Sequence, residues 1–244
     1  MEPRMEKRMN LRASAVELSA LLPSEIERMY ALYSESYRDT AYARFRADLD
    51  DKTHCVMLRG ADGAIVGFST LKRYVTRWQG ADIRVIFSGD TIVDPAHWGS
   101  QQLAFEWIRR AGQTWREAPD LPLYWFLIVK GHRTYRYLSA FAREYAPRVG
   151  EVAADTMRAL MDHLASERYG RAYDPSTGLL RFAEPMGRLA PALADIPAAH
   201  RQLPEVEYFL QRNPQYARGD ELVCLCELKA SNLRPLARRL FDAA

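Results

Sequence analysis

Residues 83–110 read IRVIFSGDTIVD-PAHWGS-QQLAFEWIRR, and this stretch decides the fold. It begins with a long apolar strand, Ile83 to Asp94, and ends with an amphipathic helix over 101–115. Pro95 and Gly99 mark the tight turn between them. The first amides of a helix have no partner within the helix, and the helix dipole is positive at that end. A strand that runs through such a turn into a helix therefore predicts an anion-binding site.

Within this stretch, Asp90-Thr91-Ile92-Val93-Asp94-Pro95 is followed by Trp98-Gly99. In these residues the chain resembles the Gcn5-related N-acetyltransferase (GNAT) superfamily, and the order of its elements resembles that family over residues 12 to 148. The family's usual loop is Gln/Arg-x-x-Gly-x-Gly/Ala. With Gly99 aligned, Ala96 and Gln101 stand at the first and last places, so the usual arginine and second glycine are absent.

The resemblance implies a thioester donor, either acyl-CoA or an acyl-pantetheine carrier, whose pantetheine arm lies between two splayed strands. The departure from the usual loop favours a longer acyl-CoA or an acyl group on acyl carrier protein, as in GNAT-like N-acyl amino acid synthases. Ile92 and Val93 are expected to orient the pantetheine. Phosphate is expected on the amides of the turn formed by Trp98, Gly99, Ser100, Gln101 and Gln102. Two alternatives stay open: a plain strand-to-helix connection with Ser100 as N-cap, and Trp98 as a core aromatic rather than a stacking partner.

Asp90 is the predicted general base. Strand alternation places Ser88, Asp90, Ile92 and Asp94 on one face. A carboxylate inside an apolar strand is costly to bury unless it is paired or used, and an amine must lose a proton before it attacks. Alternatively, Asp90 caps a bulge at Gly89 or pairs with an arginine, and Asp94 fixes the turn before Pro95. A bulge at Gly89 would free an amide for the acyl carbonyl.

The helix after the second parallel strand carries Tyr135 and Tyr137. The resemblance implies that one of them protonates the leaving thiolate, although both also fit a core position. Lys130, His132 and Arg133 precede this helix and are candidate contacts for phosphate or for an acidic carrier protein. As charges on a solvated loop they need no such role.

The remaining elements predict an α/β fold, a GNAT-like mixed sheet flanked by helices. A capping box, Ser24-x-x-Glu27, opens the first helix. The strands ending near Asp94 and Val129 should be parallel, with a right-handed crossover helix between them. We expect a flexible leader over 1–11, an acyltransferase core over 12–150, and a C-terminal α+β extension over 151–244 packed on the same sheet through the strand 221–228.

Composition excludes several classes of protein. The net charge is only +3 without a Lys/Arg block, so we expect no nucleic-acid partner. No apolar run approaches the ~20 residues of a membrane span. Cys224 and Cys226 lie two apart in a strand-like run, so both should be buried thiols on one face, and no metal site is expected. These features, with a charged N-terminus, predict a cytoplasmic protein.

Together these features predict an N-acyltransferase that moves an acyl group from a thioester carrier to a small-molecule amine by direct attack. The alternative is a catalytically inactive GNAT-like module for ligand binding or assembly, which the departures from the usual loop favour. The sequence does not define the oligomeric state.

Overall fold

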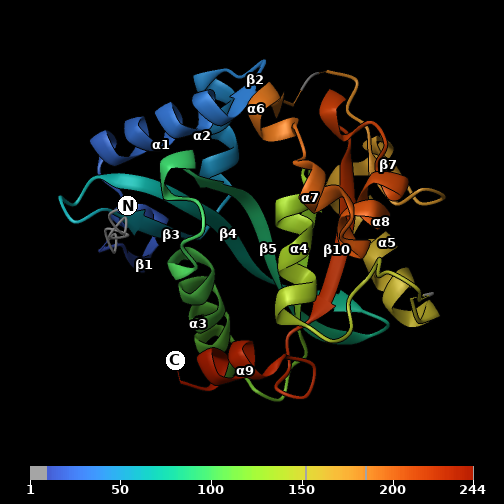
Figure 1. The fold of residues 1–244 in the computed structure, drawn as a ribbon. Coiled ribbons are helices and arrows are strands. Elements are labelled where there is room, and N and C mark those ends of the chain that lie inside the picture. Colours follow the sequence, from blue (N-terminus) through green and yellow to red (C-terminus); the bar gives the residue numbers. More distant parts are fainter. Residues whose placement is uncertain (1–9, 152, 185, 244) are drawn as a thin grey trace, which may run out of the picture.

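The fold is built around one eight-stranded mixed sheet in a computed structural model that describes residues 10–151, 153–184 and 186–243. Most of the predicted leader, residues 1–9, lies outside this description. The sheet order is β1-β3-β4-β5-β6-β10-β8-β7 (Figure 1). Its strands are β1 (Arg12–Glu17), β3 (His54–Arg59), β4 (Ile65–Trp78), β5 (Ala81–Val93), β6 (Leu123–Val129), β10 (Glu221–Glu227), β8 (Leu179–Leu180) and β7 (Tyr173–Asp174). The predicted α/β class, a mixed sheet flanked by helices, is confirmed.

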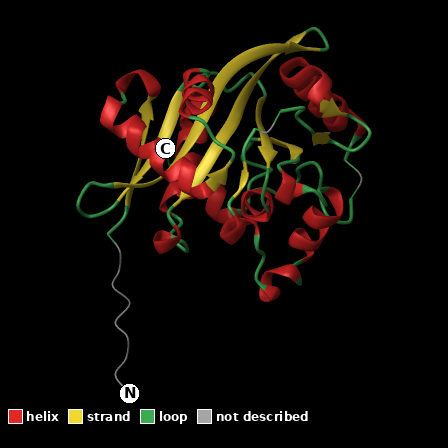
Figure 2. Ribbon diagram, turned by 90° about the horizontal axis from the view of Figure 1, so that it is seen from above, coloured by secondary structure: helices red, strands yellow, loops and turns green. Residues whose placement is uncertain are grey.

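Helices cover both faces of this sheet, and Figure 2 shows the twisted strands running between them. One face packs against α3 (Gln102–Arg116), α4 (His132–Phe141), α8 (Pro204–Arg212) and α9 (Pro235–Asp242). The other packs against α1 (Pro23–Ser36), α2 (Tyr42–Asp50) and α5 (Asp155–Tyr169). The short elements β2 (Tyr37–Arg38), β9 (Arg188–Leu189), α6 (Pro191–Ala194) and α7 (Ala198–Arg201) lie outside the sheet. No described helix has both the length and the apolar character needed to cross a membrane.

The two central strands, β5 and β6, are parallel, as predicted. Their pairing runs from Arg84↔Leu123 to Ser88↔Leu127 and ends there, although β5 continues to Val93. The last five residues of β5 therefore have an edge that β6 does not cover. Ligands in such sheets bind outside the carboxyl ends of the strands, which places a candidate site at this gap.

A β-bulge in β5 corrects the predicted side-chain alternation. Ser69 pairs with Thr91 and Leu71 with Ser88, so one residue of β4 opposes both Gly89 and Asp90. Because a bulge inserts one extra residue, the pattern reverses beyond it. Ser88 thus faces the α3 side, where Trp125 Nε1 donates to its hydroxyl at 2.8 Å, whereas Asp90 faces the α1 side. The predicted bulge at Gly89 is confirmed; the predicted shared face of Ser88 and Asp90 is wrong.

Two local predictions at the N-terminal end are also corrected. The first helix begins at Pro23, and the side chain that caps it is Glu25, whose Oε2 accepts from Leu22 N–H at 2.9 Å. The predicted Ser24-x-x-Glu27 capping box is therefore wrong, because Ser24 lies inside the helix and Glu25 rather than Glu27 makes the capping hydrogen bond. β1 was not predicted because its six residues alternate between half-buried and exposed at a sheet edge.

A buried arginine fixes the orientation of α3. Arg84 is 7% exposed, and its guanidinium donates to Thr114 O at 2.5 Å, Trp115 O at 3.2 Å and Leu121 O at 2.9 Å. The last carbonyls of a helix lack partners within the helix and carry partial negative charge. The Arg84 guanidinium, which comes from β5, donates hydrogen bonds to these carbonyls and balances their charge. The opposite end of α3, the turn 98–102, is thereby held at the end of β5.

The C-terminal residues complete the sheet beyond β6. β10 pairs antiparallel with β6 from Leu222↔Val129 to Glu227↔Tyr124, and β8 and β7 follow outside it. Cys224 and Cys226 are both buried in the core on the α3 face, as predicted, and neither forms a disulfide.

Candidate active site

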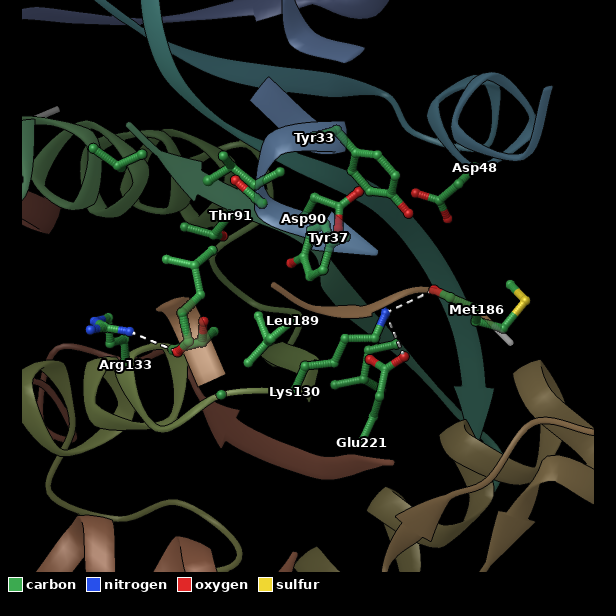
Figure 3. Close-up of a pocket in the computed structure, with 18 of the residues that line it drawn as sticks. Tyr33, Tyr37, Asp48, Asp90, Thr91, Lys130, Arg133, Met186, Leu189 and Glu221 are labelled. Atoms are coloured by element: carbon green, nitrogen blue, oxygen red, sulfur yellow. Dashed lines mark hydrogen bonds and ion pairs between the residues drawn. The ribbon is translucent and has the colours of Figure 1, made fainter. Parts of the chain in front are cut away.

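A cavity of about 340 Å³ opens at the carboxyl ends of β5 and β6 (Figure 3). Its walls come from α1, β2, α2, the end of β5, the β6–α4 turn, the end of α5 and the C-terminal segment. The residues that line it include Tyr33, Tyr37, Asp48, Asp90, Val93, Trp98, Lys130, His132, Arg133, Met186, Leu189, Leu193 and Glu221. Within the described residues, no group of His, Cys, Asp and Glu side chains is arranged to hold a metal ion.

Asp90 projects into this cavity from the bulge of β5 (Figure 3). Burial raises its pKa to about 7; nearby Asp48 and Glu221 act in the same direction, and Lys130 and Lys52 oppose them. No hydrogen bond or ion pair from the described residues reaches its carboxylate, so the alternative in which Asp90 pairs with an arginine is not observed. A carboxylate with a pKa near neutrality can take a proton from an amine at physiological pH.

A buried lysine lies behind the bulge. The side chain of Lys52 is fully buried, and its Nζ donates to Asp48 Oδ1 at 2.7 Å and to Asp48 O at 2.8 Å. A Cβ on Gly89 would lie 2.7 Å from Lys52 Cε and 2.4 Å from Thr70 Oγ1. A side chain at 89 would therefore have to displace the stem of Lys52 or the hydroxyl of Thr70, which fill the space beside the glycine.

A second buried carboxylate was not predicted from the sequence. Glu221, the first residue of β10, is 4% exposed, and burial raises its pKa. Its Oε1 lies 3.2 Å from Lys130 Nζ, which also donates to Met186 O at 3.1 Å and lies 5.2 Å from the centre of the Tyr37 ring. Lys130 thus points inward, so the alternative of a solvated loop charge does not apply to it, whereas its contact with phosphate or a carrier protein stays a prediction. The only signal for Glu221 was a charged residue opening an apolar strand.

The C-terminal segment covers one side of the cavity. Its strand β9 pairs with β2 through Tyr37↔Leu189 and Arg38↔Arg188. Met186, Leu189 and Leu193 from this segment line the cavity. This side of the cavity is therefore built jointly by elements more than 140 residues apart in the chain.

The uncovered edge of β5 faces the gap left where β6 ends. Asp94 N–H donates to Val66 O on the β4 side at 2.9 Å, so the backbone of Val93 faces the opposite way, toward the gap. Val93 O accepts from Trp98 Nε1 at 2.9 Å. The Arg133 guanidinium lies 4.2 Å from the centre of the Trp98 ring and donates to Leu193 O at 3.1 Å. Trp98 is 41% exposed and belongs to this contact rather than to the core.

The predicted phosphate-binding turn has the expected course. Asp94 Oδ1 accepts from Ala96 N–H at 2.9 Å, which confirms that Asp94 fixes the turn. Gly99 has a φ of +93°, a conformation that favours glycine. Gln102 N–H lies 3.4 Å from the Ser100 hydroxyl, a long capping contact. Ile92, Val93 and Trp98 line the cavity, whereas Gly99, Ser100, Gln101 and Gln102 lie outside it on the accessible surface beside its mouth.

The two tyrosines of α4 occupy different places. Tyr135 is fully buried and does not line the cavity around Asp90. Its hydroxyl donates to Pro147 O at 2.8 Å. Tyr137 stacks on Phe141 with ring centres 5.6 Å apart and lines a second cavity of about 20 Å³ on the α3 face. Thr91 borders both cavities, so the smaller one lies just across the sheet from Asp90. Tyr137 therefore remains a candidate acid, and we leave Tyr135 out of the proposed site.

His132 is 1% exposed, and burial, with help from Arg133 and His200, lowers its pKa to about 4. It is therefore neutral at physiological pH, and any contact of His132 with phosphate would be a neutral hydrogen bond.

No protein-family model matches the chain, and no curated protein sequence matches it significantly. Several solved structures resemble it. A conserved protein of Enterococcus faecalis, described as a probable N-acyltransferase, is 12% identical with a TM-score of 0.42; the match covers 55% of this chain and 33% of that one. A GNAT family N-acetyltransferase of Escherichia coli in complex with CoA is 18% identical with a TM-score of 0.39, covering 54% of this chain and 69% of that one. An acyl-CoA N-acyltransferase of Pseudomonas aeruginosa is 20% identical with a TM-score of 0.40, covering 60% and 94% respectively.

Proposed function

We propose that the protein is an N-acyltransferase that moves an acyl group from a thioester carrier to an amine by direct attack. The observation that carries this proposal is Asp90: a carboxylate to which no described residue is hydrogen-bonded, with a pKa near 7, inside a cavity at the gap between two parallel strands. The resemblance of residues 90–99 to the GNAT superfamily supports the same reaction.

In this proposal the donor's pantetheine arm lies along the uncovered edge of β5 and hydrogen-bonds to the backbone near Val93. The exposed amides of the turn 99–102 bind the donor's phosphates. The acyl carbonyl accepts a hydrogen bond at the bulge, where the regular ladder with β4 is interrupted.

The amine then approaches from the α1 side and gives a proton to Asp90. Its lone pair attacks the carbonyl carbon, the tetrahedral intermediate collapses, and the C–S bond breaks. The thiolate leaves and is protonated, with Tyr137 as the candidate donor if the sulfur reaches the smaller cavity. No covalent bond to the enzyme forms.

The test is release of free thiol from acetyl-CoA, longer acyl-CoAs and acylated carrier protein, each supplied with a panel of primary amines. Removing a general base typically costs about 10²–10⁴-fold in rate, so we expect a loss in that range for Asp90→Asn. Asp82→Asn is the matched control, because Asp82 lies on the same strand with a side chain 56% exposed and only a long 3.9 Å ion pair to Arg77. Equal activity of the Asp90 variant and wild type would refute the role of the base.

One observation favours a second candidate, a ligand-binding module without catalysis. Val93 O, which the donor arm would use, already accepts from Trp98. Binding of an amine in the cavity by a protein that binds no thioester carrier would support this alternative over the transferase.

A further inference from the structure

A guanidinium group is held at the side of the cavity that α5 forms. Arg168, the residue before the last of this helix, lines the cavity, and its side chain is 22% exposed. Its guanidinium carbon lies 4.1 Å from the centre of the Phe87 ring, and its Nε donates to the Tyr169 hydroxyl at 3.3 Å. Its Nη2 donates to the carboxylate of Asp51. The guanidinium is therefore fixed both by a ring face and along one edge.

The other edge of this guanidinium is open. An arginine has five N–H donors, and within the described residues Arg168 uses only two of them. Its Nη1 nitrogen has no hydrogen-bond partner among those residues and is accessible, so it can reach a ligand in the cavity. A fixed arginine with a free edge suits a carboxylate, because the two planar groups can form two parallel hydrogen bonds.

The charges around Arg168 leave a positive excess. Asp51 accepts hydrogen bonds from both Arg168 and Lys72, so one carboxylate serves two cations. Lys52 also lies 4.0 Å from Asp51, but it is paired with Asp48 at 2.7 Å. An anion bound at Arg168 would therefore balance a charge that the surrounding side chains leave uncompensated.

The lining of the whole cavity also favours a ligand with negative charge. Its cationic side chains are Arg44, Lys130, Arg133 and Arg168. Its carboxylates are Asp48, Asp90 and Glu221. Glu221 is paired with Lys130, and Asp90, with a pKa of about 7, is only partly ionised at neutral pH. The cations of the lining thus outnumber its ionised carboxylates.

The bulge in β5 sets the distance between Arg168 and the proposed reaction centre. Phe87, against which the guanidinium packs, lies three residues before Asp90 on this strand. Residues three apart on a regular strand project from opposite faces, but the extra residue at the bulge brings Phe87 and Asp90 to the same face. The two positions are about 7–10 Å apart along the strand. A molecule with a carboxylate a few bonds from its reacting atom can therefore span them.

We propose that Arg168 binds a carboxylate group on one of the two substrates of the transfer reaction. Two kinds of substrate offer this chemistry: an amine that carries a carboxylate, and a thioester whose acyl group comes from a dicarboxylic acid. In both, the carboxylate and the reacting atom lie a few bonds apart. This inference rests on the proposed function for the identity of that substrate, but its binding test does not.

The first test is an NMR titration with hexanoate, with hexanamide as an uncharged probe of the same shape. The titration is run at pH 6, where Asp90 is mostly protonated. Hexanoate should bind at least about tenfold more tightly than hexanamide, because a hydrogen bond between two charged groups contributes more than one to a neutral group. Equal affinity for the two probes, or no binding of hexanoate, would overturn the proposal.

The second test repeats the titration with variants of Arg168. Arg168→Met should weaken hexanoate binding by at least about tenfold and leave hexanamide binding unchanged. Arg168→Lys keeps the charge but loses the planar pair of donors, so it should recover part of the affinity. Arg158→Met is the matched control, because Arg158 lies on the same helix with a side chain 55% exposed and does not line this cavity.

Two results of this test would refute the proposal. Equal hexanoate affinity of wild type and Arg168→Met would place the anion on another cation of the lining. Equal losses for hexanoate and hexanamide in Arg168→Met would assign Arg168 a structural role instead.

Transfer assays then identify the substrate that carries the carboxylate. One arm compares phenylalanine with phenethylamine at a fixed donor, and the other compares succinyl-CoA with acetyl-CoA at a fixed amine. In one of these pairs, Arg168→Met should lower kcat/KM at least about tenfold for the member with a carboxylate and leave its counterpart unchanged. That pair names the source of the carboxylate. An unchanged kcat/KM for both carboxylate substrates would refute a role of Arg168 in the reaction.

These outcomes separate the inference from the proposed function. Hexanoate binding that depends on Arg168, without transfer from any donor to any amine, would sustain the carboxylate site and remove the transferase. Transfer that depends on Asp90, with hexanoate binding and turnover both independent of Arg168, would retain the transferase and remove the site.

Discussion

Replacing Trp98 with phenylalanine should tighten donor binding. The indole N–H of Trp98 occupies Val93 O at 2.9 Å, on the edge of β5 that the proposed donor arm uses. Phenylalanine removes this hydrogen bond but keeps an aromatic ring beneath Arg133. A hydrogen bond of this kind contributes about 0.5–1.5 kcal/mol net, which corresponds to about a twofold to twelvefold change in affinity. Because Trp98 is 41% exposed and water competes for its N–H, we expect about twofold to fourfold.

The assay is calorimetric titration of wild type and Trp98→Phe with the thioester donor that the transfer assay identifies, or with CoA. Trp78→Phe is the matched control, because Trp78 ends β4 beside His163 and lines neither cavity near Asp90. The control should leave donor affinity unchanged. Equal or weaker donor binding by Trp98→Phe would refute the view that the indole competes with the donor, and would make Trp98 a direct contact of the ligand instead.

Three further variants test stability and the bulge. Asp90 has a pKa of about 7 in the fold, against about 3.9 in an unfolded chain, so folding stability should fall as pH rises from about 4 to about 7. Asp90→Asn should therefore raise Tm at pH 8 and have little effect near pH 4, while transfer is lost; a pH-independent effect would contradict the raised pKa. Gly89→Ala should destabilise the fold by about 1–3 kcal/mol and abolish transfer, because its Cβ would collide with Thr70 and Lys52. Arg84→Met should lower the free energy of unfolding by about 1.5–3 kcal/mol in urea titrations, because three hydrogen bonds from a charged group to carbonyls are lost. Arg84→Lys should recover part of this free energy.

Local sequence patterns were sufficient to predict the central part of the fold. The sequence predicted the strands β5 and β6, the helix between them and the burial of Cys224 and Cys226. In these segments the hydrophobic periodicity and the turn residues indicate the same elements. The bulge at Gly89 was predicted from the glycine, yet its effect on alternation was not applied to Ser88. One inserted residue moves the side chains beyond it to the opposite face of the sheet. Simple alternation therefore placed Ser88 on the same face as Asp90, which is wrong.

The charged groups around Asp90 could not be predicted as a cluster for a different physical reason. Asp48 and Glu221 come from separate parts of the chain, and each resembles an ordinary surface charge in its own segment, whereas Lys130 was singled out only as a candidate contact for phosphate or a carrier protein. Only the packing of α2 and β10 against the end of β5 brings them around Asp90. Burial then changes their properties, and burial depends on contacts that no local window contains.

Because β9 pairs with β2, the two proposed substrate sites are built from different segments of the chain. The elements proposed for the donor lie within residues 83–116, whereas the wall facing the amine includes Met186, Leu189 and Leu193 from a segment some distance along the chain. In the proposed transferase, substitutions of Met186 and Leu189 should therefore alter which amine is accepted without changing residues 83–116. A library confined to residues 186–193, screened with one fixed donor, is consequently a direct route to new amide products.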